Sequence, residues 1–434
     1  MSRFQLYVNP RQKEWSDLCA RPTKGLVKIG QNVKRITNMV KNQGDSALKF
    51  LAQDIDGILI TNIAVSEAEF AEAEAQVDAA TREAIEAAYA NIEKFHKAQM
   101  PQTIEVETAP GVKCWQKPVP VEKVGLYIPG GTAPLFSTVL MLAIPAKVAG
   151  CSEIEICTPV SVVTGKVAPE VLYAAKRCGI TKVYKAGGAQ AIAAMAYGTE
   201  TVGKVDKIFG PGNRFVTLAK QMLGGKVVAV DMPAGPSEVM VIADATADPA
   251  FVAADLLSQA EHGADSHVML VADSRKVYTA VKAELATQIA LLYRADFAAK
   301  SLRRSRCVVF DGRGSRQKMC DFANVYAPEH LIINTRNPWE MVERITAAGS
   351  VFVGPYTPES AGDYASGTNH TLPTGAWARS YSGVNVDAYM RKMTIQEISR
   401  EGLSGLSRTI TTLAEAEGLQ AHANAVRLRL TEDE

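Results

Sequence analysis

The sequence predicts an α/β fold in which two parallel sheets are covered by helices and flanked by helical segments at both ends. Short β-branched runs alternate with helical segments from about residue 124 to 210, and again from 239 to 354. Strict alternation of strand and helix favours a parallel sheet with helices on both faces. With 434 residues, 47% of them hydrophobic, the chain is long enough for two sizeable cores.

Residues from about 25 to 98 are expected to be helical. The stretch that begins at Ser66 is rich in Ala and Glu and has apolar residues at helical spacing. Ser66 and Glu69 have the spacing of a capping box, which marks the start of a helix. The helical character ends at Met100-Pro101.

Two series of strands follow. The first is predicted at VGLYIP, EIEICTP, KVYKAG and KVDKIFG, with helices at 138–150, 168–178 and 190–197. After a connector at 231–236, the second comprises VMVIAD, HVMLVAD, CVVFD, LIINT and VFVG, with helices at about 248–262, 274–292, 314–323 and 337–346. The similar rhythm allows a distant duplication, although no residue-level repeat supports one.

The C-terminal part of the chain changes character twice. Residues 358–374 are rich in Gly, Ser and Thr without periodicity, and we expect a long loop, which in a compact protein is usually functional or disordered. Residues 387–430 are expected to be helical, with a break at Gly418. These two helices are too isolated to have a core of their own, so we expect them to pack on another body, such as a second subunit.

Charge and composition exclude several classes of protein. The formal net charge of +1 gives no reason to expect a nucleic-acid partner or binding to an anionic membrane. The N-terminus lacks the apolar segment of a secretory signal, and the longest apolar run, at 139–144, is too short to span a bilayer. The seven cysteines form no CxxC pair, which argues against a disulfide framework or a thiolate zinc site. We therefore expect a cytoplasmic protein with reduced thiols.

The six histidines divide into two groups. His96, near the end of an amphipathic helix, is expected to be a surface or helix-end histidine, and His267, at the start of a strand, is expected to be structural. The other four lie in polar segments: His262, His330, His370 and His422. Gln259 and His262 are three residues apart at a helix end, so they share a face and could bind a divalent metal. Taken alone this signal is weak, because a histidine near a helix C-terminus often just interacts with the last carbonyls of the helix.

Two further candidates lie later in the chain. Asp363 and His370 belong to the 358–374 loop, where small residues let the backbone approach a ligand; a flexible surface loop with an Asx turn is the alternative. His422 falls in the first turn of the last helix, where the helix dipole favours the neutral imidazole that a metal needs. A solvent-facing tail histidine is the alternative at that position.

Glu329 and His330 stand next to each other immediately before a strand. A carboxylate and an imidazole are the usual pair for moving protons and activating water near neutral pH. Neighbours on a straight strand face opposite ways, so both enter one site only if Pro328 bends the chain. As a bare dipeptide, the pair is more often a solvated turn.

Three glycine-rich turns, at 129–131, 187–190 and 210–213, each follow a strand and precede a helix. This arrangement presents backbone N–H groups to a phosphate. Neither GxGxxG nor GxxxxGK[ST] occurs, so the standard dinucleotide and P-loop signatures are absent. Tight turns of an α/β sheet explain each turn singly, whereas three in succession modestly favour a nucleotide site.

Taken together, these segments resemble the histidinol dehydrogenase family over nearly the whole chain. The resemblance is carried, in the family's order, by GLYIPGG, GGAQAIAA, KIFGPGN, DMPAGPSEV, DLLSQAEHG, APEHL, ESAGDYASGTNH and the tail TIQEISREGL with EGLQAHANAV. It implies a homodimer with two incomplete Rossmann-like domains. The implied divisions are a helical arm at 1–25, a first Rossmann-like domain at 26–126 plus 237–383 with most zinc and catalytic residues, a second, NAD-binding domain at 127–236, and a small helical domain at 384–434 exchanged in the dimer.

The resemblance also implies the residues of the site. One zinc ion per subunit would be held by Gln259, His262, Asp363 and His422, with His422 reaching the partner's site so that each active site is shared. The catalytic pair would be Glu329 and His330. Contacts with NAD are implied for Tyr127, Gln190 and Asn213. Contacts with the substrate are implied for Ser237, Gln259, His262, Glu329, His330, Asp363, His370, Glu417 and His422.

The implied activity is the zinc-dependent, four-electron oxidation of L-histidinol through L-histidinaldehyde to L-histidine with two NAD, the final step of histidine biosynthesis. His330 would take the hydroxyl proton in each oxidation, and Glu329 would help water attack the aldehyde. Zinc would mainly position the substrate. Three alternatives stay open: a sister NAD-dependent dehydrogenase acting on another small polar alcohol such as a sulfonated diol, a zinc hydrolase that uses Glu329 without NAD, and a non-catalytic nucleotide-binding protein.

Overall fold

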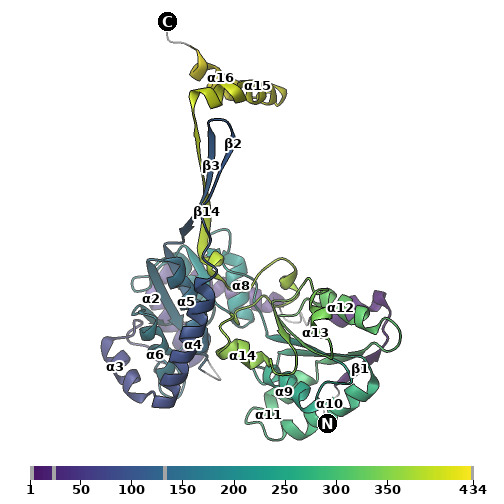
Figure 1. Cartoon of the computed structure of the whole chain (residues 1–434). Coiled ribbons are helices and arrows are strands. Elements are labelled where there is room, and N and C mark those ends of the chain that lie inside the picture. The colour runs from purple at the N-terminus through teal and green to yellow at the C-terminus, as the bar shows by residue number, and fades with distance from the viewer. Residues whose placement is uncertain (1–3, 22–25, 131–133, 432–434) are drawn as a thin grey trace.

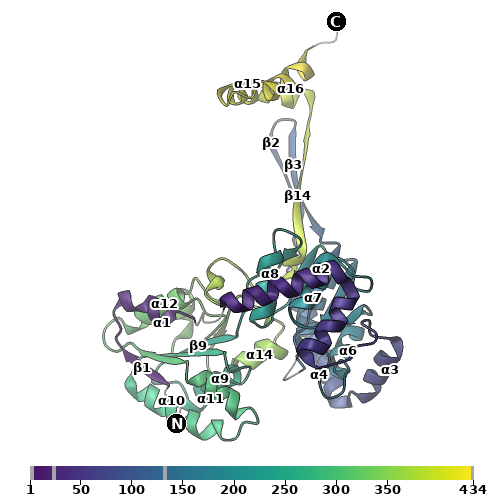
Figure 2. The ribbon, with the colours of Figure 1, turned by 180° about the vertical axis from the view of Figure 1, so that it is seen from behind.

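The computed structural model describes residues 4–21, 26–130 and 134–431. Two α/β bodies lie side by side, and a narrow stalk rises from one of them and carries the C-terminal helices (Figure 1). The same arrangement is seen from behind in Figure 2. Gly131, which belongs to one of the predicted glycine turns, lies outside the described residues. Within those residues, no helix is both long and apolar enough to cross a membrane.

The first body is built on a parallel six-stranded sheet in the order β1-β11-β10-β9-β12-β13. Its strands are β1 (Gln5–Val8), β9 (Glu238–Ala243), β10 (His267–Ala272), β11 (Arg306–Val309), β12 (His330–Asn334) and β13 (Ser350–Val353). One face is covered by α9 (Pro249–Ala260), α10 (Arg275–Ile289) and α11 (Ala295–Leu302), and the other by α1 (Trp15–Cys19), α12 (Ser315–Tyr326) and α13 (Pro338–Val342).

Successive residues of β9 explain why both faces need helices. Val239 and Val241 belong to the core under α9 and α10, whereas Met240 and Ile242 belong to the core under α12. Side chains alternate between the faces of a strand, so a run of consecutive apolar residues forms a strand that is buried on both sides.

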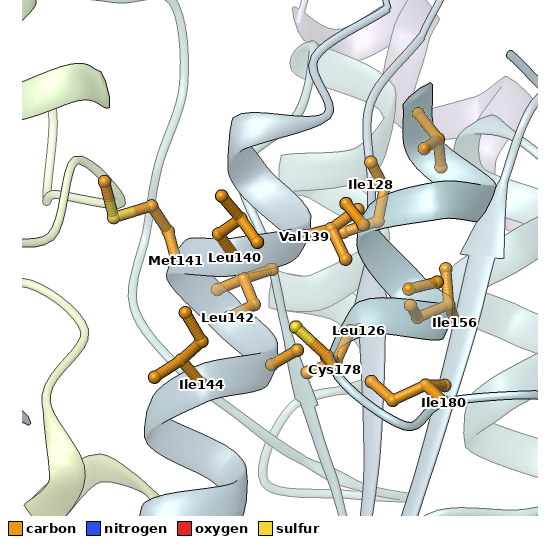
Figure 3. Packing of buried hydrophobic residues seen from close by; sticks show 14 of the residues in the cluster. Leu126, Ile128, Val139, Leu140, Met141, Leu142, Ile144, Ile156, Cys178 and Ile180 are labelled. Atoms are coloured by element: carbon orange, nitrogen blue, oxygen red, sulfur yellow. The ribbon is translucent and has the colours of Figure 1, made fainter. Parts of the chain in front are cut away.

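The second body is built on a parallel five-stranded sheet in the order β6-β5-β4-β7-β8. Its strands are β4 (Lys123–Tyr127), β5 (Glu153–Thr158), β6 (Val183–Lys185), β7 (Lys207–Phe209) and β8 (Ala229–Val230). One face packs on α3 (Glu67–Gln76), α4 (Ala79–Lys97), α5 (Ser137–Ala149) and α6 (Pro169–Arg177), and the other on α2 (Leu26–Asp56), α7 (Gly188–Tyr197) and α8 (Arg214–Leu223). Figure 3 shows part of the core between the five-stranded sheet and α5, where Val139 and Leu142 of α5 lie against Leu126 of β4 and Ile156 of β5.

These two sheets confirm the predicted α/β fold, and α2, α3 and α4 confirm the predicted helical segment at 25–98. The capping box is also formed, because the Ser66 side chain accepts from the Glu69 N–H and the Glu69 side chain accepts from the Ser66 N–H. However, α2, α3 and α4 pack on the five-stranded sheet, whereas the sequence-based division placed residues 26–126 with 237–383. The boundaries of the domains stay a prediction.

Two segments contain an element that the sequence did not predict, a strand in one and a helix in the other. The N-terminal arm, predicted as helical, begins with β1, which extends the six-stranded sheet beside β11 because its backbone pairs with Arg306–Val309 over four positions. The predicted loop at 358–374 contains α14 (Glu359–Tyr364), a short helix that begins after Pro358. Glu and Ala at its start suit a helix, and its contacts with α9 hold it in place.

The stalk contradicts the prediction that residues 387–430 are helical throughout. It is an antiparallel sheet in the order β14-β3-β2, formed by β2 (Ile104–Ala109), β3 (Val112–Pro120) and β14 (Met390–Ile398). Residues 390–398 form a strand because they pair with β3 at every position, a contact with a segment far away in sequence. Beyond it, α15 (Arg400–Ala416) and α16 (Gln420–Leu430) lie at the tip, away from both α/β bodies (Figures 1 and 2).

His267 at the start of β10 provides a test of acid stability. It is 4% exposed, and its Nδ1 lies 2.7 Å from the Tyr326 hydroxyl. Burial, followed by the charges of Arg21 and Arg306, lowers the pKa of His267 from 6.5 to about 3. Between these values the unfolded chain binds more protons than the folded one, so stability falls as pH drops through this window.

We expect the urea midpoint of His267→Gln to fall less between pH 6 and pH 4.5 than the midpoint of the unmodified chain, because the variant has lost one of the buried histidines that titrate in this range. Glutamine keeps a partner for Tyr326 but does not titrate. Urea unfolding followed at a series of pH values measures this difference. Parallel pH profiles for the two proteins would contradict the assignment.

Candidate active site

A cavity of about 230 Å³ lies between the two α/β bodies and collects most of the chemically interesting residues of the chain. Its walls come from the turns after β4 and β7, the connector before β9, the end of α9, the start of β12, and α14. Among its lining residues are eight that the sequence had singled out: Asn213, Ser237, Gln259, His262, Glu329, His330, Asp363 and His370. A larger cavity of about 430 Å³ at the ends of β4 and β5 has no histidine among its described lining residues.

The turn between α12 and β12 brings Glu329 and His330 to this cavity. The helix α12 ends at Tyr326, and Ala327 takes the left-handed conformation with φ of 50°, which is uncommon for a residue other than glycine. Such a backbone costs about 1–3 kcal/mol and persists only where the surroundings hold it. After Pro328 both side chains line the cavity. The bend that the sequence required for both to share one site is therefore present.

His330 is held with one ring nitrogen bonded and the other free. Its Nδ1 lies 3.1 Å from the Glu238 carbonyl oxygen, so Nδ1–H donates to that oxygen. Its Nε2 is buried and has no hydrogen-bond partner in the described part of the chain. Burial, with smaller effects of His370 and His262, lowers the pKa of His330 to about 3. The ring is therefore neutral and presents an unshared lone pair, which is what a proton acceptor needs.

Glu329 is positioned by the backbone of Glu238, the residue whose carbonyl also holds His330. Its Oε2 accepts a hydrogen bond of 2.7 Å from the Glu238 N–H, and burial raises its pKa well above the usual value. Glu238 itself is fixed by an ion pair of 2.7 Å with Arg21 and by the Gly375 N–H, which donates to its carboxylate at 3.1 Å. Sequence reasoning missed Arg21 and Glu238, because their roles depend on the parallel pairing of β9 with β12.

Nitrogen and oxygen donors gather on one side of His330. Ligand atoms of His330, Glu359 and Asp363 lie within 4.8 Å of one another, and His330 Nε2 is 3.7 Å from Asp363 Oδ1. Gln259 is 1% exposed, and its amide satisfies its hydrogen bonds only in the orientation in which the nitrogen donates to the Glu359 carboxylate and the oxygen points away from it. His262 follows the end of α9 and lines the same cavity with an exposed side chain.

These donors fit a zinc ion. Burial raises the pKa of Asp363 to about 7, and burial with the nearby charges of Asp363, Glu329 and Asp255 raises the pKa of Glu359 well above its usual value. Several carboxylates buried together repel one another, and a dication at this place relieves that repulsion. Amide oxygen, imidazole nitrogen and carboxylate are all ligands that zinc accepts.

Glu359 is the residue of this cluster that sequence reasoning missed. It is 1% exposed and lies one helical turn before Asp363, so the two share a face of α14. The four-residue spacing was visible in the sequence, but the expectation of a loop at 358–374 concealed its meaning.

His370 connects the two bodies. Its Nε2 lies 3.3 Å from the Ser137 hydroxyl, which belongs to the first turn of α5, and burial lowers the pKa of His370 to about 4. Ser237, immediately before β9, lines the cavity as well. Ser137 had not been singled out in the sequence.

The residues expected to contact NAD lie at the carboxyl-terminal edge of the five-stranded sheet. The strand β4 lies between β5 and β7, so the order of the strands reverses at β4. In parallel α/β sheets such a reversal leaves a crevice at the carboxyl ends of the two neighbouring strands, here β4 and β7. Gly210, with φ of 131°, must be glycine because a Cβ there would overlap the Tyr127 carbonyl oxygen. Asn213 caps α8 and lines the cavity, which fits a nucleotide site at this crevice.

Tyr127 and Gln190 are not among the described residues that line the catalytic cavity. The Tyr127 hydroxyl accepts from the Gly188 N–H at 3.0 Å, and Gln190 is 5% exposed in the first turn of α7. Glu417 and His422 are exposed at the tip of the stalk, so a single chain does not bring them to the cavity (Figure 1).

Comparison with known proteins explains this assembly of residues. A family model described as histidinol dehydrogenase matches residues 19–430. The chain belongs to the histidinol dehydrogenase family. The histidinol dehydrogenases of Bacteroides fragilis and Bacteroides thetaiotaomicron are 52% and 51% identical over 429 and 427 residues, covering 99% and 98% of this chain and 99% of each relative. The crystal structure of histidinol dehydrogenase from Elizabethkingia anophelis superposes with a TM-score of 0.94 at 48% identity, covering 99% of this chain and 98% of the other.

Membership of the histidinol dehydrogenase family confirms the resemblance seen in the motifs and makes the chain an oxidoreductase. It gives no support to a sister dehydrogenase acting on another small alcohol. The match extends through the tail, so α15 and α16 belong to the same family region as the cavity.

Proposed function

We propose that this chain oxidises L-histidinol through L-histidinaldehyde to L-histidine, with two NAD and one zinc ion per subunit, as the final step of histidine biosynthesis in the cytoplasm. The observation that carries the proposal is the buried Nε2 of His330, which has no hydrogen-bond partner among the described residues and lies beside Glu329 in a cavity rich in metal donors. Such a pair supplies the two proton acceptors that oxidation of an alcohol to an acid requires.

His330 Nε2 is suited to take the hydroxyl proton of the substrate in each oxidation. Its Nδ1–H is committed to the Glu238 carbonyl, so the ring can accept a proton only at Nε2. The positive charge that forms there is stabilised by Asp363, whose Oδ1 is 3.7 Å away. General bases of this kind contribute about 10²–10⁴-fold to a rate.

Glu329 is suited to activate the water that adds to the aldehyde. Burial raises its pKa and so makes its carboxylate a stronger base, and the Glu238 N–H fixes its orientation. Because Glu329 and His330 are both held by Glu238, the acceptor for the alcohol proton and the acceptor for the water proton keep a constant separation. Keeping the aldehyde in the cavity between the two oxidations would limit its loss to solvent.

Gln259, His262, Asp363 and His422 of the partner subunit would hold the zinc ion, and Tyr127, Gln190 and Asn213 would contact NAD. When bound, zinc would anchor the imidazole and amino nitrogens of the substrate, and NAD would accept the hydride. Ser237, His370 and Glu417 of the partner subunit complete the proposed substrate contacts.

The stalk supports a homodimer with shared sites. The strands β2 and β14 of the three-stranded sheet are mostly exposed, whereas a sheet of this size needs a buried apolar face or a packed helix to be stable. Large apolar side chains stay exposed on it and on the helices at its tip: Ile104 at 53%, Val106 at 50%, Met393 at 45%, Leu413 at 61% and Leu428 at 74%. A second copy of the chain is the partner that would cover these surfaces and receive His422.

The stoichiometry of NAD reduction tests this function. With limiting L-histidinol, we expect two NADH per substrate molecule, measured by absorbance, and loss of activity after zinc is removed with a chelator. L-Alaninol, an amino alcohol without imidazole, is the control and should give no NADH at the same concentration. One NADH per histidinol, or NADH formed equally from both alcohols, would contradict the proposal.

A further inference from the structure

The contact between α14 and α9 suggests a role for a residue outside the proposed ligand set. We propose that Glu359 is a positioning residue, whose carboxylate holds the Gln259 amide so that the amide oxygen faces the metal. The inference rests on the proposed function, because Gln259 is a proposed zinc ligand there. It assigns to Glu359 a task in metal binding without direct contact to the metal.

The two side chains meet in a fully enclosed place. Gln259 and Glu359 are each 1% exposed, Gln259 near the C-terminal end of α9 and Glu359 at the start of α14. In the orientation that satisfies the amide, the Gln259 nitrogen donates to both carboxylate oxygens of Glu359, to Oε2 at 3.2 Å and to Oε1 over a shorter distance. Turning the amide over would set its oxygen against two acceptors, which leaves buried polar groups unsatisfied.

The orientation of the amide decides whether Gln259 can bind a metal. An amide offers a ligand only through its oxygen, because its NH₂ group has no available lone pair. With the nitrogen directed to Glu359, the oxygen is on the opposite side of a residue that lines the cavity. Without an acceptor at position 359, the NH₂ group can rotate toward the cavity and the ligand is lost.

Asp363 and Glu359 differ in how far they reach into the cavity. The Asp363 side chain is 15% exposed, whereas that of Glu359 is 1% exposed and is already bonded to Gln259. Glu359 also lies 3.6 Å from His330 Nδ1, the nitrogen that donates to Glu238 rather than the free Nε2. Asp363 is therefore placed to bind the metal directly, and Glu359 is placed to bind the side chains that surround the metal.

Zinc affinity of the full-length holoenzyme, measured by competition with a fluorescent chelator, tests the inference. Glu359→Met keeps the size of the side chain but removes the acceptor, and we expect about 10–100-fold weaker zinc binding. Glu359→Gln keeps an acceptor oxygen for Gln259 and should stay within about threefold of the unmodified chain. Asp255→Asn is the matched control, because Asp255 is a buried carboxylate next to Glu359 with no described bond to Gln259, and it should also stay within about threefold.

If Glu359→Met does not fold, Glu359→Asp tests the same point, since a carboxylate shortened by one methylene cannot reach the amide and should weaken zinc binding about tenfold. Unchanged affinity in the Met or Asp variant would overturn the inference. A loss in Glu359→Gln as large as in Glu359→Met would also overturn it, because the carboxylate would then act through its charge as a direct ligand.

A Gln259→Ala arm separates this inference from the proposed function. If Gln259→Ala weakens zinc binding and Glu359→Met does not, the inference alone fails. If Gln259→Ala leaves the affinity unchanged, the proposed ligand set fails and the inference falls with it.

Discussion

Replacing His330 by asparagine is expected to lower kcat about 10³-fold while the zinc content of the protein stays at one ion per subunit. The asparagine amide can still donate to the Glu238 carbonyl, as Nδ1 does in the native chain, but it offers no basic nitrogen in place of Nε2. Steady-state assays together with metal analysis measure both quantities.

Metal analysis matters because His330 lies within ligand distance of Glu359 and Asp363. A variant that loses zinc along with activity would show that His330 is a ligand and that the base is misassigned. The matched control is His267→Gln, which changes another buried histidine at the start of a strand of the same sheet and should keep its kcat.

Mixing two inactive variants is expected to restore activity. His422→Ala removes the proposed ligand that one subunit lends to its partner, and Glu329→Gln removes a proton acceptor from the body of the subunit that carries it. In a heterodimer, the site on the Glu329→Gln subunit receives the His422→Ala tail and carries both defects. The site on the other subunit has a native Glu329 and receives a native His422. Random exchange yields about half heterodimers, so the mixture should regain roughly a quarter of the native activity.

The physical reason for this expectation is the position of His422 at the tip of the stalk, far from the cavity of its own chain (Figures 1 and 2). Heterodimers isolated with two different affinity tags supply the measurement, and each parent homodimer supplies the baseline. Verified heterodimers that stay as inactive as their parents would show that the tail does not complete a partner's site.

The two sheets could be predicted because their strands are buried on both faces. Runs such as VMVIA and VMLVA are apolar at every position, a pattern typical of a parallel strand that is covered on both faces. Glu329 and His330 could be singled out because a carboxylate and an imidazole are the usual pair for moving protons near neutral pH, although the dipeptide alone is more often a solvated turn. Their approach to one cavity still depended on the bend at Ala327 and Pro328, which the structure contains.

The stalk and Glu359 could not be predicted in the same way. The strand β14 is mostly exposed, so burial left no alternating pattern, and its partner β3 lies far away in sequence. The task inferred for Glu359 depends on a contact between α14 and α9 that joins residues 100 positions apart. Local patterns carry no information about such pairs, and Arg21 with Glu238 is a further example.

Anomalous diffraction at the zinc edge, from crystals of the dimer grown with L-histidinol, tests the central claim most directly. We predict one peak per subunit in the cavity beside Glu329 and His330, at about 2.0–2.2 Å from donor atoms of Gln259, His262, Asp363 and His422 of the partner subunit. A peak bonded instead to His330 and Glu359, or one without His422 of the partner subunit nearby, would contradict the account.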